Sequence, residues 1–179
     1  MKKTIGKNSV ISKDLKIRSK NFIVGHNSVV DSFSYISNSK FQLGNFSHIG
    51  PLCCFAGGEK NIVIGDHVSI SSNVSMYAQS NNFKEDLVTL YSNLIEDSSI
   101  SGDIIIGDFC GVGTHCTIMP NNIFPAGVTI GANSLVPPSF KFEEFTYYHG
   151  IPITPQKKRD RVKIINQSKI IEKKINEKN

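Results

Sequence analysis

The chain of 179 residues contains no tryptophan and no apolar stretch long enough to span a bilayer. Its first residues, MKKTIGKNSVIS, lack an apolar run of the length found in signal peptides. It also lacks any C-x-x-C pair, the spacing that would suggest a zinc or redox site. These absences argue against a secreted or membrane-inserted protein. We therefore expect a cytoplasmic protein that requires no metal.

Basic residues are concentrated at the end of the chain. Residues 156–179 hold nine lysines and arginines against three acidic residues, a net charge of +6, while the whole chain carries +5. Residues 1–155 therefore carry a net charge of −1, with no basic stripe, and no aromatic residue lies between the charges of the basic segment. A basic stripe and aromatic residues between the basic ones are typical of nucleic-acid-binding surfaces, and the chain shows neither, so we expect no nucleic-acid partner.

The most prominent feature of the chain is a six-residue repeat. Aliphatic or aromatic residues recur at Ile106, Val112, Ile118, Phe124, Ile130 and Val136, and the same phase runs upstream from Ile5 to Met76. A period of six fits neither a helix nor a plainly alternating strand, so it indicates a repeat architecture. Six sets of three hexads predict an all-β fold, a parallel β-helix of about six coils. The missing tryptophan fits the narrow interior of such a stack.

Several segments carry a family resemblance: FSHIGPLCCFAGG, IVIGDHVSISSNVSMYAQSNNF, IIIGDFCGVGTHCTIMP, VTIGANSLVP and YYHGIPITPQKKR. Together they resemble the left-handed β-helix of hexapeptide-repeat acyltransferases. The chain is most similar to the sugar O-acetyltransferases of bacterial surface-polysaccharide synthesis, which build lipopolysaccharide O-antigen and capsule. The resemblance implies direct acetyl transfer from acetyl-CoA to a sugar hydroxyl, or as the second candidate a sugar amine, by a homotrimer.

The repeat is interrupted once, between Met76 and Ile106, where thirty residues separate positions that six would join. About 24 residues therefore leave the coils, and a loop of this length is usually functional or disordered. We predict an excursion over residues 77–105, which in the resembling family reaches over a neighbouring subunit. Residues 1–155 are then the β-helix domain, with this excursion inserted.

Residues 156–179 are predicted to form a basic C-terminal α-helix. Apolar and small residues recur at helical spacing along it, at Ile164, Ser168, Ile171 and Ile175. Such a stripe favours packing on a coil face or on a neighbouring subunit.

His48 is the candidate catalytic residue. The equivalent position in successive coils holds Val10, Val29, His48, Ser69, Gly111 and Thr129, so His48 is the one ionisable group of its column and is followed by small residues. An imidazole, with an unperturbed pKa of about 6.5, suits a general base acting on a hydroxyl near neutral pH. The resembling family carries a similar segment beside the acetyl group. The alternative is an ordinary surface histidine.

The resemblance assigns the coenzyme to the last two coils. Small residues there, at Gly113, Thr114, Gly131 and Ala132, are expected along the pantetheine arm. Basic residues just beyond, at Lys157, Lys158 and Arg159, are expected to meet the coenzyme phosphates as point charges.

The resemblance also places the acceptor at the start of the excursion, at Tyr77, Asn81 and Asn82. No histidine lies within residues 77–105, where many family members have a catalytic one. Asn81 and Asn82 stand where the nearest family members have an Asp-Asp pair. An asparagine can hydrogen-bond a sugar hydroxyl but cannot act as a base.

The cysteines are expected to be structural. Cys53, Cys110 and Cys116 share a slot that small residues occupy in other hexads, where a cysteine behaves as a small buried apolar residue. With no nucleophilic cysteine and no Ser-His-Asp set evident, we expect no acyl-enzyme. Three alternatives remain: a nucleotide-sugar N-acetyltransferase, a non-catalytic β-helix scaffold and a metal-dependent hydrolase or lyase. The five histidines share no column, which argues against the last.

Overall fold

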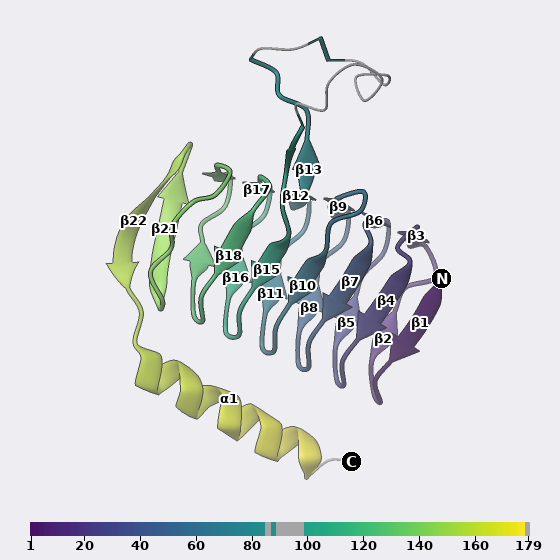
Figure 1. Ribbon diagram of the computed structural model, residues 1–179. Helices are drawn as coiled ribbons and strands as arrows, with labels where there is room; N and C mark the ends of the chain where they lie inside the picture. The colour runs from purple at the N-terminus through teal and green to yellow at the C-terminus, as the bar shows by residue number, and fades with distance from the viewer. Residues whose placement is uncertain (85–86, 89–98, 178–179) are drawn as a thin grey trace.

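The computed structural model describes residues 1–84, 87–88 and 99–177 and shows one long stack of coils (Figure 1). The stack is a parallel β-helix, so the fold predicted from the six-residue repeat is confirmed. Of the predicted excursion, residues 85–86 and 89–98 lie outside the described residues. No helix within the described part of the chain is long and apolar enough to cross a membrane.

Three parallel sheets, here named A, B and C, run along the stack, because each coil adds one short strand to each sheet. Sheet A contains β1 (Lys2–Ile5), β4 (Asn21–Val24), β7 (Lys40–Leu43), β10 (Ile62–Ile64), β15 (Ile104–Ile106) and β18 (Asn122–Phe124). Sheet C contains β3 (Lys16–Ile17), β6 (Tyr35–Ser37), β9 (Cys54–Ala56), β12 (Ser75–Tyr77), β17 (Thr117–Ile118) and β20 (Leu135–Val136).

Sheet B carries most of the candidate site. It contains β2 (Val10–Ile11), β5 (Val29–Val30), β8 (His48–Ile49), β11 (Ser69–Ile70), β16 (Gly111–Val112) and β19 (Thr129–Ile130), followed by β21 (Thr146–Gly150) and β22 (Ile153–Lys158). The strand β21 pairs in parallel with β19 and begins a seventh turn, and β22 pairs antiparallel with β21. The six coils expected from the sequence are therefore extended by one partial turn.

The hexad side chains fill the interior. Ile49, Ile70 and Met76 have no exposed surface, and Phe41 stacks between Phe22 and Phe55 with ring centroids 5.4 and 5.7 Å apart. Parallel pairing is in register from coil to coil, so each side chain rests on its counterpart in the next coil. The same register aligns the outward-facing side chains of each sheet into columns.

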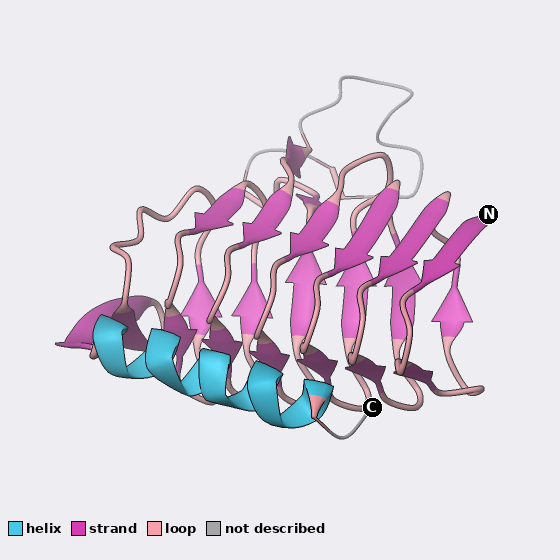
Figure 2. Cartoon of the chain, turned by 90° about the horizontal axis from the view of Figure 1, so that it is seen from below, coloured by secondary structure: helices cyan, strands magenta, loops and turns pink. Residues whose placement is uncertain are grey.

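The C-terminal helix α1 (Arg161–Asn176) runs back along the row of coils beside the corner between sheets A and B (Figure 2). It begins later than residue 156, because β22 continues to Lys158 and Asp160 caps the helix by accepting a hydrogen bond from the N–H of Lys163 at 2.9 Å. Of the predicted stripe, Ser168 is buried and Ile171 is 48% exposed.

The described part of the excursion begins as an antiparallel ribbon. The strands β13 (Gln79–Ser80) and β14 (Ile100–Ser101) pair with each other and project from the coils on the side away from α1 (Figure 1). Ala78 and Ile104, which flank the ribbon, are fully buried in the β-helix. The excursion therefore leaves and re-enters the stack at fixed points.

Candidate active site

His48 lies on the outward face of sheet B and is paired with a carboxylate. Its Nε2 lies 2.8 Å from Oδ2 of Asp31, and the two side chains are 47% and 42% exposed. Asp31 follows β5, one coil earlier, so the stacking of β5 on β8 brings the pair together. A carboxylate in this position fixes the ring orientation and engages Nε2, which leaves Nδ1 as the nitrogen that would accept a proton from a substrate.

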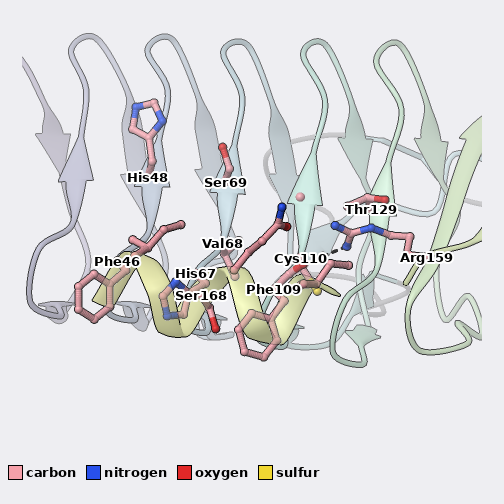
Figure 3. A pocket seen from close by; sticks show the side chains of 14 residues that line it. Phe46, His48, His67, Val68, Ser69, Phe109, Cys110, Thr129, Arg159 and Ser168 are labelled. Atoms are coloured by element: carbon pink, nitrogen blue, oxygen red, sulfur yellow. Dashed lines mark hydrogen bonds between the residues drawn. The ribbon is translucent and has the colours of Figure 1, made fainter. Parts of the chain in front are cut away.

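A groove with a volume of about 420 Å³ begins at His48 and runs along sheet B (Figure 3). Its floor is formed by the outward-facing column of sheet B, and one wall is formed by α1. The residues that line it are Phe46, His48, His67, Val68, Ser69, Phe109, Cys110, Gly111, Thr129, Arg159, Ile164, Gln167, Ser168 and Ile171. Beyond His48 the floor residues of sheet B, Ser69, Gly111 and Thr129, have small side chains or none. We call it the central groove.

An aromatic row holds α1 in place as the wall of the central groove. The ring of His67 lies between those of Phe46 and Phe109, with centroids 5.1 and 5.5 Å apart. Its Nε2 lies 2.7 Å from Oε1 of Glu172 on α1, and the histidine side chain is only 12% exposed. The helix is therefore fixed by a specific polar contact as well as by apolar packing.

A second cavity, the basic pocket, continues the central groove beyond Thr129. It has a volume of about 590 Å³ and is lined by Thr129, Tyr147, Lys157, Lys158, Arg159, Asp160, Lys163, Ile164 and Gln167. Four of these residues also line the central groove, namely Thr129, Arg159, Ile164 and Gln167. The two cavities therefore form one path, with an imidazole at one end and a cluster of cations at the other.

The three predicted phosphate-binding cations differ in their contacts. Arg159 donates from Nη1 to the carbonyls of Phe109 and Gly127, at 3.1 and 2.5 Å, and its partial burial lowers its pKa. Lys158 bonds to Glu143 at 2.6 Å, and that contact lowers the pKa of the carboxyl. Arg159 therefore ties the connection between β22 and α1 to the coils, while Lys157 and Lys163 line the basic pocket.

The small residues predicted to contact the coenzyme lie at the other edge of sheet B. Thr114 donates a hydrogen bond to the carbonyl of Ser72 at 2.8 Å. A Cβ on Gly131 would lie 2.5 Å from the hydroxyl of Tyr147, so that β21 covers this glycine. Gly113, Thr114, Gly131 and Ala132 do not line either described cavity. They lie beside the path.

The predicted acceptor residues lie far from His48 within one chain. Tyr77 ends β12 on sheet C, while Asn81 and Asn82 follow β13 in the ribbon. The described residues that line the central groove include none of the three. The structure therefore places His48 and the cations along one path. The residues at the start of the excursion do not lie on that path within one chain.

Sequence reasoning missed Asp31, Lys163 and Gln167. Asp31 could in principle have been predicted, because the coil register pairs Val29 with His48 and Asp31 is two residues beyond Val29, on the same face of the strand. Lys163 and Gln167 could not have been predicted as site residues, because their position beside the coils depends on the direction in which α1 crosses them. That direction follows from contacts such as those of Glu172 with His67 and of Arg159 with the carbonyls of Phe109 and Gly127.

Cys53, Cys110 and Cys116 are buried and Cys54 is half-buried. Burial raises the pKa of Cys53 to about 11 and that of Cys110 to about 12, and it also raises the pKa values of Cys54 and Cys116. Because the thiolate is the nucleophilic form, these thiols are poorly suited to carry an acyl group. Within the described residues, no three His, Cys, Asp or Glu side chains gather as metal ligands would.

Comparisons with known proteins identify close structural similarity. AntD, an N-acyltransferase from Bacillus cereus solved with dTDP and 3-hydroxybutyryl-CoA, is 30% identical, with a TM-score of 0.84 over 97% of this chain and 91% of that one. A variant of AntD solved with dTDP-4-amino-4,6-dideoxyglucose and coenzyme A gives a TM-score of 0.85 at 28% identity, over 95% and 91% of the two chains.

A curated relative gives a consistent result. The dTDP-4-amino-4,6-dideoxy-D-glucose acyltransferase of Escherichia coli is 28% identical over 163 residues, which are 89% of this chain and 83% of that protein. No family model matches the sequence.

The raised thiol pKa values predict slow alkylation of the folded protein. At pH 8, iodoacetamide should modify Cys53 and Cys110 at least about 100-fold more slowly than a free cysteine, because few of their thiols are ionised. Since these folded-state pKa values exceed that of an unfolded thiol, the free energy of unfolding should also fall as the pH rises above about 9. Mass spectrometry of the labelled peptides measures the rates, and the denatured protein is the control. Rapid labelling of either thiol in the folded protein would contradict the assignment.

Proposed function

The chain belongs to the hexapeptide-repeat acyltransferases, and from this we propose that it transfers an acyl group from coenzyme A to the amino group of a dTDP-linked 4-amino-4,6-dideoxy sugar. The observation that carries the proposal is the continuous path from His48 to Lys157 and Lys163. It offers a base at one end and cations for phosphates at the other.

The nature of the acceptor is supported by the relatives. AntD was solved with dTDP, with an acyl-CoA and, as a variant, with an aminosugar nucleotide. The Escherichia coli relative carries such a substrate in its name. These similarities favour the nucleotide-sugar N-acyltransferase that the sequence left as an alternative over O-acetylation of a hydroxyl. The acyl group is acetyl or a short hydroxyacyl chain.

The path has the shape of an extended thioester arm. From His48 the column passes through Ser69, Gly111 and Thr129 to Tyr147, which is four strand steps. At about 4.8 Å per step, this distance is roughly 19 Å. An extended pantetheine arm can lie on such a floor, with its thioester at His48 and its phosphates in the basic pocket.

In the proposed reaction, the acceptor amine attacks the thioester carbonyl carbon while His48 takes a proton from the amine nitrogen. A C–N bond forms and gives a tetrahedral oxyanion. When the oxyanion collapses, the C–S bond breaks, and coenzyme A leaves as a thiol with the proton returned by His48. Asp31 orients the imidazole and stabilises its protonated form.

We also propose that the protein acts as a cytoplasmic homotrimer. Tyr77, Asn81 and Asn82 do not reach the central groove of their own chain, so a neighbouring copy is needed to bring them to a groove. Apolar side chains on the outer face of sheet A support such contacts, since Ile105 and Ile123 are 38% and 62% exposed. The closed cyclic arrangement repeats one interface three times.

The proposed function is tested with a panel of acceptors. With acetyl-CoA or 3-hydroxybutyryl-CoA as the donor, free thiol should be released with dTDP-4-amino-4,6-dideoxyglucose and not with dTDP-glucose, which offers only hydroxyls. Mass spectrometry of the product identifies the amide. Release with dTDP-glucose would favour O-acetylation instead. No release with any acceptor, together with no acyl-CoA binding by calorimetry, would favour a non-catalytic scaffold.

The role of the histidine is tested by His48→Asn. This change should lower kcat by about 10²–10⁴-fold, as expected when a general base is lost, with little change in the KM for acyl-CoA. Asp31→Asn should give a smaller loss, because the amide can still orient the ring. The matched control is His115→Asn, because Asn73 and Asn133 hold the equivalent corner with a similar positive φ. A His48→Asn variant as active as the wild type would overturn the assignment.

The role of the cations is tested by changing Lys157 and Lys163 together to Ala. The KM for acyl-CoA should rise by about 10-fold, the equivalent of about 1.4 kcal/mol of ionic contact, while kcat stays nearly constant, because the phosphates are remote from the thioester. Lys169 and Lys174 changed together to Ala remove the same charge from exposed positions of α1 outside both cavities. Equal effects from the two pairs would show a general charge effect in place of a phosphate site.

A further inference from the structure

Gly111 differs from every other glycine of this chain. All fourteen glycines lie in the described residues, and a Cβ added at thirteen of them would come closer than 3.0 Å to another atom. At Gly113, for example, it would lie 2.5 Å from the backbone nitrogen of Ala132. At Gly111 the nearest atom is the methyl group of Thr129 at 3.2 Å, followed by the carbonyl oxygen of Ser69 at 3.8 Å. The 3.2 Å contact is tight, so a Cβ at Gly111 would fit once the methyl group of Thr129 shifts by a few tenths of an ångström. Packing therefore opposes a side chain here much less than at the other thirteen glycines.

Backbone conformation does not require a glycine at this position. Gly111 is not among the residues with a positive φ, the region in which glycine is favoured. It begins β16, and its neighbours in the column, Ser69 and Thr129, both carry side chains in the same register. A glycine within a strand lowers the stability of the folded protein relative to a residue with a side chain. The fold itself gives no reason for this loss of stability at position 111.

The position of Gly111 supplies the explanation. It lies in the floor of the central groove, one strand beyond Ser69, and Ile164 and Gln167 of α1 line the same groove. It lies midway along the path that joins His48 to the cations. A side chain at this point would rise into the groove between sheet B and α1, which is the space that a thioester arm must cross.

We infer that Gly111 is a specificity-determining residue that keeps the central groove open for the pantetheine arm of the acyl donor. The inference rests on the proposed function. It assigns the arm to the part of the central groove that passes over Gly111, between sheet B and α1. It also predicts that the size of the side chain at position 111 sets the affinity for acyl-CoA without affecting the fold.

A graded series of substitutions tests this inference. Gly111→Ser, which reproduces the neighbouring Ser69, should raise the KM for acetyl-CoA only about 2- to 3-fold. Gly111→Val should raise it at least about 10-fold, the loss expected when a bound group no longer fits. The thermal midpoint of Gly111→Val should stay close to that of the wild type, because the strand propensity of Val offsets the small shift required of the Thr129 methyl group. The matched control, Val10→Leu, enlarges a side chain on the same face outside the central groove and should leave KM unchanged.

Accessibility gives a second measurement that does not depend on turnover. In Gly111→Cys, the introduced thiol should react readily with iodoacetamide at pH 8, in contrast to the buried native thiols, and saturating acetyl-CoA should slow this labelling at least about 10-fold. Labelling that is unaffected by acetyl-CoA, or a Gly111→Val variant that folds and keeps the wild-type KM, would overturn the inference. A wild type that transfers no acyl group from any CoA thioester would instead overturn the proposed function.

Discussion

The stacking of each coil on the next, in register, is the constraint on which the rest of this structure depends. Parallel strands pair residue for residue through all three sheets, so a side chain lies on its counterpart in the neighbouring coil. Inside, this places Phe41 between Phe22 and Phe55 and fills the narrow core. On the outside, the same register aligns residues at equivalent positions of successive coils into columns. The candidate site follows one such column, which begins at His48.

This register is why so much could be predicted from the sequence. A six-residue period defines the coils, the buried positions and the outward columns at once, so the small residues beyond His48 were visible without a structure. The same register pairs Val29 with His48, so it would also have shown Asp31, two residues further on, as a diagonal neighbour of His48. Lys163 and Gln167 lay beyond such reasoning, because α1 is outside the repeat and its path is determined by contacts that no period encodes.

Other features of the site were hidden because they depend on backbone groups. Arg159 stays predicted to meet a phosphate, but the sequence did not show that its guanidinium also donates to the carbonyls of Phe109 and Gly127. Whether a basic residue binds a ligand or the main chain depends on the orientation of nearby backbone carbonyls. That orientation cannot be inferred from the sequence alone. The residues at the coil corners also could not be interpreted from the sequence. Phe46, His67 and Phe109 adopt a positive φ, which is usually associated with Gly or Asn. Their stacking on one another and on α1 accounts for the aromatic residues there.

The contact between His67 and Glu172 joins residues that are 105 positions apart in the chain. During synthesis the coils can stack one after another as they leave the ribosome, because each needs only its predecessor. The wall of the central groove belongs to α1, which follows all of them. Although His48 and Asp31 meet early, the groove beside them therefore gains its wall only when α1 is made. An incomplete chain would hold the His48–Asp31 pair without the complete groove.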